Sequence, residues 1–151
     1  ILMSAALMGQ HNRMLQDKYR RLSTDVLEYE ETLVDDAELL FVAYGITARI
    51  CSSAVRRLRG RGVRAGMLRP KTLFPFPTDR IRALARGGTL RAVVAAELSA
   101  GQMAEDVELA VRGALPVLRY GWLGGVVPTE GEIEERVLRD EALAGRIGGV
   151  K

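Results

Sequence analysis

The sequence predicts an α/β domain in which helices cover both faces of a parallel sheet. Two observations lead to this fold class. Short, almost continuously apolar stretches, typical of strands buried on both faces, alternate with segments whose apolar residues recur at helical spacing. Such an alternation of strands and helices is typical of parallel sheets. With 151 residues, 48% of them apolar, the chain is long enough to bury the core of one such domain.

A helical segment is predicted ahead of this domain. Apolar residues within 11–34 are separated alternately by four and three positions, so they share one face of one helix or of two consecutive helices. These residues are Leu15, Tyr19, Leu22, Val26, Tyr29 and Leu33. We therefore divide the chain into an interdomain linker of one or two helices, residues 1–36, and the α/β domain, residues 37–151.

No targeting or membrane-spanning segment is predicted. Residues 1–8 are apolar but have no start methionine, basic flank or cleavage site, so we expect them to belong to a longer polypeptide rather than to a signal peptide. The longest apolar run, residues 39–46, is too short to cross a bilayer. We therefore expect no membrane association.

The first half of the domain is predicted to contain two strands and two helices. Residues 37–44 (AELLFVAY) form a doubly buried strand, and a turn then leads to a helix that Thr47 is expected to cap. A second strand covers residues 63–68. A short helix capped by Thr78 follows the loop of residues 71–77 (KTLFPFP), which its prolines hold extended.

The two phenylalanines of this loop, Phe74 and Phe76, have two interpretations. Exposed aromatic side chains would form an interaction site. Alternatively, the same side chains cover the edge of the sheet. The sequence favours neither interpretation over the other.

The second half of the domain repeats the alternation. A third strand over residues 92–98 leads to a helix, and the spacing of Ser99 and Gln102 fits a capping box at its start. A fourth strand over residues 116–120 precedes a glycine-rich loop and a C-terminal helix, which a second capping box opens at Thr129. The glycine-containing tail is expected to fray.

The simplest doubly wound arrangement places these strands in the order second, first, third, fourth. The turns at residues 45–47 and 99–102 then face each other at the carboxyl edge of the sheet, where ligands or partner loops dock. A helix N-terminus at this edge could also bind an anion. The candidate interface or switch-point residues are Gly45, Ile46, Thr47, Phe74, Phe76, Ser99, Gly101 and Gln102.

Catalytic motifs are missing from the sequence. Cys51 is the only cysteine and His11 the only histidine, so this chain alone cannot form a disulfide, a four-cysteine iron–sulfur cluster or a histidine-based metal site. Phosphate-binding and nucleophile motifs are not found either. Glu97 is expected to bond to backbone or to a partner. We therefore predict no catalytic, cofactor-binding or metal-binding residue, and the cysteine usage fits a reducing, cytoplasmic location.

A run of arginines over residues 56–64 is the main concentration of charge. The net charge of the chain is only +3, and no aromatic residues alternate with these arginines, as a single-strand binder would require. The solvated end of a helix explains the run better than nucleic-acid binding does. We therefore expect no nucleic-acid partner.

Several short segments form an ordered pattern across residues 11–128. They are His11-Asn12, Leu15-Gln16, Lys18-Tyr19, residues 42–50 (VAYGITARI), Ala54-Val55, Leu58-Arg59, residues 69–77 (RPKTLFPFP) and residues 99–106 (SAGQMAED). This pattern resembles the C-terminal part of the alpha subunit of 2-oxoacid:ferredoxin oxidoreductases, with the 2-oxoisovalerate type the most similar.

The resemblance implies a transketolase C-terminal-like domain. That fold has three αβα layers and a mostly parallel sheet of about five strands, one of them antiparallel. The residue patterns identify four strands and leave the fifth without a position.

The resemblance also implies where the chemistry takes place. The holoenzyme uses thiamine diphosphate, magnesium, iron–sulfur clusters and coenzyme A to convert a 2-oxoacid to an acyl-CoA, and it passes electrons to ferredoxin. The thiamine, the metal and the clusters would be bound by a preceding domain, the beta subunit and other subunits. The present region would therefore bind no cofactor and would not be active alone.

Two functions follow from these observations. In the first, the chain is the non-catalytic C-terminal domain of such an alpha subunit, assembling with the beta subunit and other subunits into an oligomer. In the second, it is a free-standing module that binds a small molecule or an anion through Ser99, Gly101 and Gln102.

Overall fold

Five strands form one sheet in the order β1-β3-β2-β4-β5. The structure is a computed structural model, and it describes residues 4–150. The first three residues of the apolar segment 1–8 therefore lie outside the described residues. The elements are α1 (Ala5–Asp25), β1 (Tyr29–Thr32), β2 (Leu39–Ala43), α2 (Gly45–Gly60), β3 (Ala65–Pro70), α3 (Thr78–Arg86), β4 (Ala92–Glu97), α4 (Gln102–Val111), β5 (Val117–Gly121) and α5 (Glu130–Leu138).

The predicted order of the four parallel strands is confirmed. β2 pairs in parallel with both β3 and β4, and β4 pairs in parallel with β5. The switch point therefore lies between β2 and β4, as the sequence predicts.

The predicted helix over residues 11–34 is wrong in its second part. α1 ends at Asp25, and β1 (Tyr29–Thr32) pairs antiparallel with β3 as the edge strand. This is the antiparallel fifth strand that the resemblance implies. Spacing alone cannot separate a helix end from a four-residue strand. The open backbone edge of β3 decides, because it supplies hydrogen-bond partners that lie far away in the sequence.

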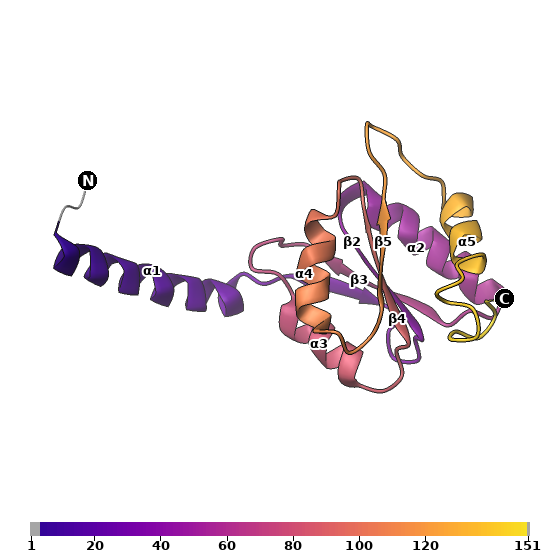
Figure 1. Cartoon of the computed structure of the whole chain (residues 1–151), viewed down its shortest axis with the longest axis horizontal. Helices are drawn as coiled ribbons and strands as arrows, with labels where there is room; N and C mark the ends of the chain where they lie inside the picture. The colour runs from indigo at the N-terminus through magenta and orange to yellow at the C-terminus, as the bar shows by residue number, and fades with distance from the viewer. Residues whose placement is uncertain (1–3, 151) are drawn as a thin grey trace.

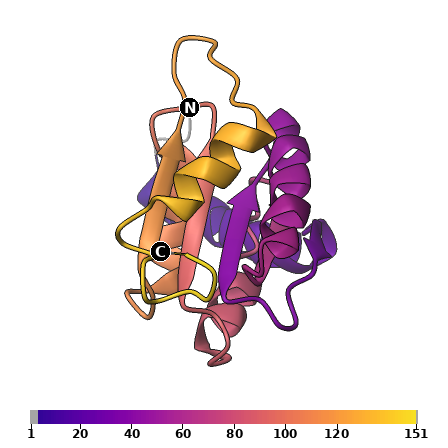
Figure 2. The same ribbon diagram turned by 90° about the vertical axis from the view of Figure 1, so that its right-hand side faces the viewer.

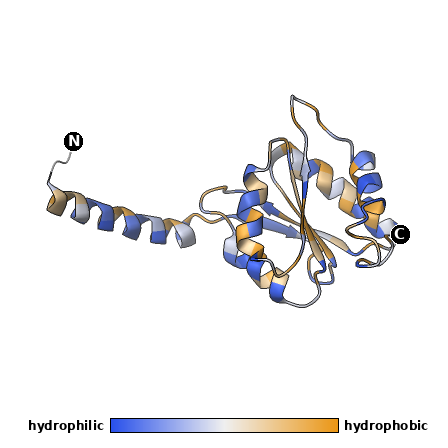
Figure 3. Ribbon diagram, viewed as in Figure 1, coloured by the Kyte–Doolittle hydropathy of each residue, from blue (hydrophilic) through white to orange (hydrophobic). Residues whose placement is uncertain are grey.

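Alternating side chains divide the core into two layers. On β2, Leu39 and Phe41 face one apolar cluster, with α2 and α5, whereas Leu40 and Val42 face the other, with α3 and α4. Figure 2 shows α2 and α5 side by side on their face of the sheet, and in Figure 3 apolar colouring predominates on the strands. The three layers thus follow from the two-residue period of the strands.

One long helix stands outside these layers. Figure 1 shows α1 extending away from the sheet and from the other helices, and none of its 21 residues is buried. Within residues 4–150, no helix is both long enough and apolar enough to cross a membrane.

The C-terminal tail is packed, which contradicts the expectation that it frays. The side chains of Leu143, Ile147 and Val150 are buried in the same cluster as α2 and α5. The backbone N–H of Gly148 also donates to a carboxylate oxygen of Glu38 at 3.2 Å. Apolar burial and this hydrogen bond offset the backbone freedom that the glycines bring.

The connection from β1 to β2 is held by Arg59 of α2. Its guanidinium donates to the Leu33 carbonyl at 2.9 Å and to both carboxylate oxygens of Asp36, and its Nε donates to the Ala65 carbonyl. Leu33 has a φ of 55°, which is unusual for a branched residue. The turn also passes so close to β3 that a Cβ at Gly66 would lie 2.4 Å from the Leu33 carbonyl oxygen.

Replacing Gly66 with alanine is expected to lower the free energy of unfolding by about 1–3 kcal/mol, because the new methyl group meets backbone atoms that cannot move aside cheaply. Urea denaturation followed by circular dichroism measures the change. The matched control is Gly60→Ala at the end of α2, where a Cβ would meet nothing within 4 Å and stability should stay equal or rise. Equal stability of both variants would show that the turn does not press on β3.

Candidate functional site

The carboxyl edge of the sheet is organised by Glu97, the last residue of β4. Its side chain is buried and accepts hydrogen bonds from the backbone N–H groups of Met103, at 3.1 Å, and Ala104, at 2.9 Å. The hydroxyl of Ser99 donates to the same carboxylate. The expectation that Glu97 bonds to backbone is confirmed. A carboxylate at a helix start is favoured both by the free N–H groups and by the helix dipole.

Three predicted helix caps are wrong. Thr78 does not cap α3, because it is already the first residue of that helix, and the N-cap is Pro77 with no side-chain cap. At the start of α4 the N-cap is Gly101, with a φ of 107°, and no side-chain cap is formed by Ser99 with Gln102. Thr47 does not cap α2 but lies buried inside its first turns, because the helix already begins at Gly45. In contrast, the capping box of Thr129 and Glu132 at α5 is confirmed.

Glu97 occupies the position that an anion would take. The N–H groups of Met103 and Ala104 are the donors that a helix N-terminus offers, and both already bond to this carboxylate. An incoming anion would meet a negative charge there. The geometry therefore speaks against the anion-binding alternative at Ser99, Gly101 and Gln102.

The pocket at this edge lies between β4 and β5. Its volume is about 200 Å³, and its lining combines predicted and unpredicted residues. These are Ala95, Glu97, Ser99, Ala100, Gly101, Arg119, Tyr120, Gly121 and Leu123. Gly45, Ile46, Thr47 and Gln102 are not among them, so this pocket does not join the two predicted turns. Their role as interface residues stays a prediction.

Sequence reasoning missed the contribution of β5 to this pocket. Tyr120 is buried with its hydroxyl donating to Asp140 at 2.9 Å, and burial is the main cause that raises its pKa above the ordinary value. Arg119 forms a bidentate ion pair with Glu108 of α4. The only signal in the sequence is that both residues end a strand at the carboxyl edge.

The two phenylalanines of the 71–77 loop differ in their surroundings. Phe76 is partly buried and packs against the core cluster of α3 and α4. Phe74 is 70% exposed and meets the ring of Tyr19 on α1 edge-on, with 5.9 Å between ring centroids. Phe74 is thus exposed and Phe76 packs against the core, and the role of either side chain in an interface stays a prediction.

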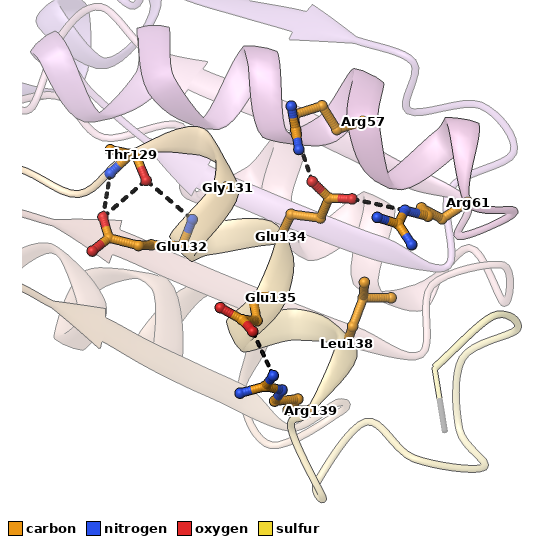
Figure 4. Close-up of a pocket in the computed structure, with 9 residues that line it drawn as sticks. All are labelled: Arg57, Arg61, Thr129, Gly131, Glu132, Glu134, Glu135, Leu138 and Arg139. Carbon is orange, nitrogen blue, oxygen red and sulfur yellow. Dashed lines mark hydrogen bonds and ion pairs between the residues drawn. The ribbon is translucent and has the colours of Figure 1, made fainter.

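Most of the arginine run is engaged in ion pairs within the domain. Arg57 of α2 and Arg61, which directly follows that helix, both donate to Glu134 of α5, at 2.5 and 3.0 Å, across a cleft of about 560 Å³ (Figure 4). Arg64 pairs with Glu38. Figure 4 shows the Glu134 carboxylate pointing between the two arginines. This cleft therefore stabilises the contact between α2 and α5, and its charges are satisfied by the protein itself.

The residues described do not fit a metal or a thiolate-bound cluster. No group of three or more histidine, cysteine, aspartate or glutamate side chains is placed to hold a metal ion within residues 4–150. Cys51 lies buried on α2, and burial raises the pKa of its thiol to about 12, so it stays protonated. The preference for a structural thiol, which its place on an apolar helix face indicates, agrees with this environment.

Comparison with protein families shows to which family the chain belongs. Residues 37–133 match the family described as pyruvate:ferredoxin oxidoreductase core domain II. The chain belongs to this family. The match runs from the start of β2 into α5 and so covers the parallel strands and the edge just described.

Curated relatives of this core domain II chain are oxidoreductase subunits. Ketoisovalerate oxidoreductase subunit VorB of Methanothermobacter thermautotrophicus is 52% identical over 103 residues, which is 68% of this chain and 29% of the relative. The 2-oxoglutarate synthase subunit KorA of Methanocaldococcus jannaschii is 34% identical over 127 residues, or 83% of this chain and 33% of the relative. The chain thus spans about a third of the length of these relatives.

Solved structures confirm the three-layer, transketolase-like fold of this core domain II. The 2-oxoglutarate:ferredoxin oxidoreductase from Magnetococcus marinus superposes with a TM-score of 0.72 at 22% identity, covering 90% of this chain and 23% of that one. A split-gene transketolase, an inactive beta4 tetramer, superposes with a TM-score of 0.60 at 18% identity, covering 81% and 42%.

Replacing Glu97 with alanine is expected to lower the free energy of unfolding by about 2–3 kcal/mol, because it leaves two backbone N–H groups without their acceptor. Thermal or urea denaturation measures the loss. The control is Glu105→Ala, an exposed glutamate in the first turn of α4, for which a change of about 0.5 kcal/mol or less is expected. A Glu97 variant as stable as the control would disprove the capping role.

The Glu134 ion pairs should make stability depend on pH. The hydrogen bond from Arg57, with the charges of both arginines, holds the pKa of Glu134 below its ordinary value of 4.5. Its stabilisation is therefore complete above that value and is lost as the pH falls through the lower, folded-state pKa.

Glu134→Gln should thus cost about 1–2 kcal/mol at pH 7, a modest amount because both arginines are more than half exposed. The gap to the unchanged protein should close below about pH 4. Chemical denaturation across this range measures it. Glu135→Gln, which alters an exposed pair with Arg139, is the control with a smaller, flatter effect. A gap for Glu134→Gln that persists in acid would contradict the assignment.

Proposed function

We propose that this chain is the C-terminal α/β domain of the alpha subunit of a 2-oxoacid:ferredoxin oxidoreductase, and that its task is to hold the subunits together. Membership in the core domain II family and the names of the curated relatives support this. The 52% identity to the ketoisovalerate subunit favours a branched-chain 2-oxoacid as the substrate of the whole enzyme.

The observation that carries the proposal is the isolation of α1. A helix of 21 residues is roughly 30 Å long. Its side chains at Leu7, Met14 and Tyr19 are between 43% and 63% exposed. Apolar side chains exposed along a helix of this length need another surface to cover them, because helical stability comes mainly from packing. Within the described part of the chain, the ring of Tyr19 meets that of Phe74.

Exposed apolar side chains occur near this contact, in the last turns of α1, just after it and in the 71–77 loop. We call Tyr19, Val26, Leu73 and Phe74 the linker patch; each of the four is at least 43% exposed. Two hydrogen bonds join the loop after β3 to the segment before β1: the backbone N–H groups of Lys71 and Thr72 donate to the Glu28 carbonyl at 2.9 and 3.2 Å. Aromatic side chains fixed on a rigid backbone are typical centres of protein interfaces.

The chemistry of the enzyme would then lie outside this chain. The proposal assigns thiamine diphosphate, magnesium, iron–sulfur clusters and coenzyme A to other parts of the complex, with ferredoxin as the electron acceptor of the whole. The single, buried cysteine supports this, because a thiolate-bound cluster needs several accessible thiols. The role of this chain would be to set the geometry between subunits, with the beta subunit as the main partner.

The test is co-expression of the chain, within its complete subunit, with the beta subunit. Phe74→Ala combined with Tyr19→Ala should weaken the complex about tenfold or more, since two aromatic contacts are removed from the linker patch. Size-exclusion chromatography and mass photometry at falling concentration measure assembly, and ferredoxin reduction measures activity.

Leu109→Ala is the control for this experiment. Leu109 on α4 is 69% exposed, which matches Phe74, but it lies outside the linker patch. This variant should assemble normally. If the aromatic double variant assembles and turns over as well as the control, the linker patch is not the interface.

A further inference from the structure

A second pocket with an unusual charge lies between α2 and the edge of the sheet formed by β1 and β3. We call it the basic pocket. Its volume is about 280 Å³, and Arg49 and Arg56 of α2 line it together with Arg69 of β3. The hydroxyl-bearing residues Ser52 and Ser53 complete the α2 side. The pocket is distinct from the carboxyl-edge pocket and from the linker patch.

The positive charge of the basic pocket is not neutralised by the domain itself. Among residues 4–150, neither Arg49 nor Arg56 forms an ion pair, whereas their neighbours Arg57, Arg59 and Arg61 all do. The charges of Arg49 and Arg56 are therefore not neutralised by any side chain of the described residues.

The single acidic side chain in the lining does not cancel this charge. Glu30 bonds to Arg69 at 3.1 Å and to Lys71 at 2.9 Å, so two cations already share it. Within the lining, three arginines thus face one glutamate. The electrostatic potential in the pocket therefore favours an anion.

The hydrogen-bonding groups of the pocket are also unused. The hydroxyls of Ser52 and Ser53 make no hydrogen bond within the described part of the chain. By contrast, the hydroxyls of Ser23 and Thr24 on α1 donate to backbone carbonyls. The Nε of Arg69 is covered but has no acceptor among residues 4–150. A ligand oxygen drawn to this guanidinium would supply the missing acceptor after a small rotation of the side chain.

We propose that the basic pocket binds a small phosphorylated molecule. Arginine guanidinium groups bind phosphate through paired, charge-assisted hydrogen bonds, and the hydroxyls of Ser52 and Ser53 add neutral donors for further phosphate oxygens. The pocket is slightly smaller than the roughly 300–1,000 Å³ typical of ligand pockets, which favours a small ligand. This size suits a phosphate with a few carbon atoms better than a nucleotide.

Binding there would connect to the linker patch through β1 and the loop after β3. Glu30 lies on β1, and its partner Lys71 belongs to the loop that carries Leu73 and Phe74. A phosphate that competes with Glu30 for Arg69 would loosen the contact between the two strands. This consequence is separate from the binding itself.

The experiment is isothermal titration calorimetry of the full chain in a phosphate-free buffer. The probes are inorganic phosphate, glycerol 3-phosphate, acetate and adenosine monophosphate. Phosphate and glycerol 3-phosphate should bind, acetate should bind at least tenfold more weakly, and the nucleotide should bind no better than phosphate. Arg49→Gln combined with Arg56→Gln should raise the dissociation constant about tenfold or more.

The matched control is Arg86→Gln combined with Arg91→Gln. Both residues are exposed and lie outside the basic pocket, and the two substitutions remove the same net charge as those at Arg49 and Arg56. Phosphate affinity should stay within about twofold of the unchanged chain if the site is specific. Equal losses in the two double variants would show a diffuse charge effect and overturn the proposal.

A third variant separates pocket chemistry from any loss of folding. Ser52→Ala combined with Ser53→Ala keeps every charge and should still weaken phosphate binding severalfold. Circular dichroism confirms that each variant is folded. The site would be rejected if the unchanged chain bound no phosphate at 20-fold excess in the low millimolar range. It would also be rejected if both the serine variant and the arginine variant bound phosphate as well as the unchanged chain.

Discussion

Burial of β2 and β4 on both faces is the constraint on which the rest of the structure depends. Every residue of these two strands is buried, so apolar helices must cover both sides of the sheet. The same burial forces polar groups near the strand ends to find partners within the domain. Glu97 illustrates this requirement, because the last residue of β4 carries a buried carboxylate that bonds to the start of α4.

Charges near the carboxyl edge are largely satisfied within the domain. The helix start that could bind a ligand is occupied by Glu97, and four of the five arginines of the 56–64 run pair with Glu134, Asp36 and Glu38. What remains unsatisfied lies elsewhere. The apolar face of α1, the linker patch and the basic pocket are surfaces whose partners the described chain does not supply, and these are where interaction is proposed.

Sequence reasoning reached the candidate site only in part. Periodicity located the turns before α2 and α4, because apolar strands end there in a recognisable way. It placed the capping role on Ser99 rather than on Glu97, since a capping box is a local pattern and a carboxylate reaching from a strand end is not. Arg119 and Tyr120 were missed because they reach the pocket only through the pairing of β5 with β4. A pattern in the sequence does not show which strands are neighbours.

The sequence alone determined the fold class, the order of the four parallel strands, the single buried thiol and the family resemblance. These depend on hydrophobic periodicity and residue types, which are local properties. Only the tertiary structure decided that residues 29–32 are a strand, that the C-terminal tail packs and which arginines stay unpaired. Each of these depends on a partner far away in the chain: the open edge of β3, the apolar cluster beside α5, and the positions of Glu134, Asp36 and Glu38. Hydrogen bonds and packing across such distances outweigh local propensity.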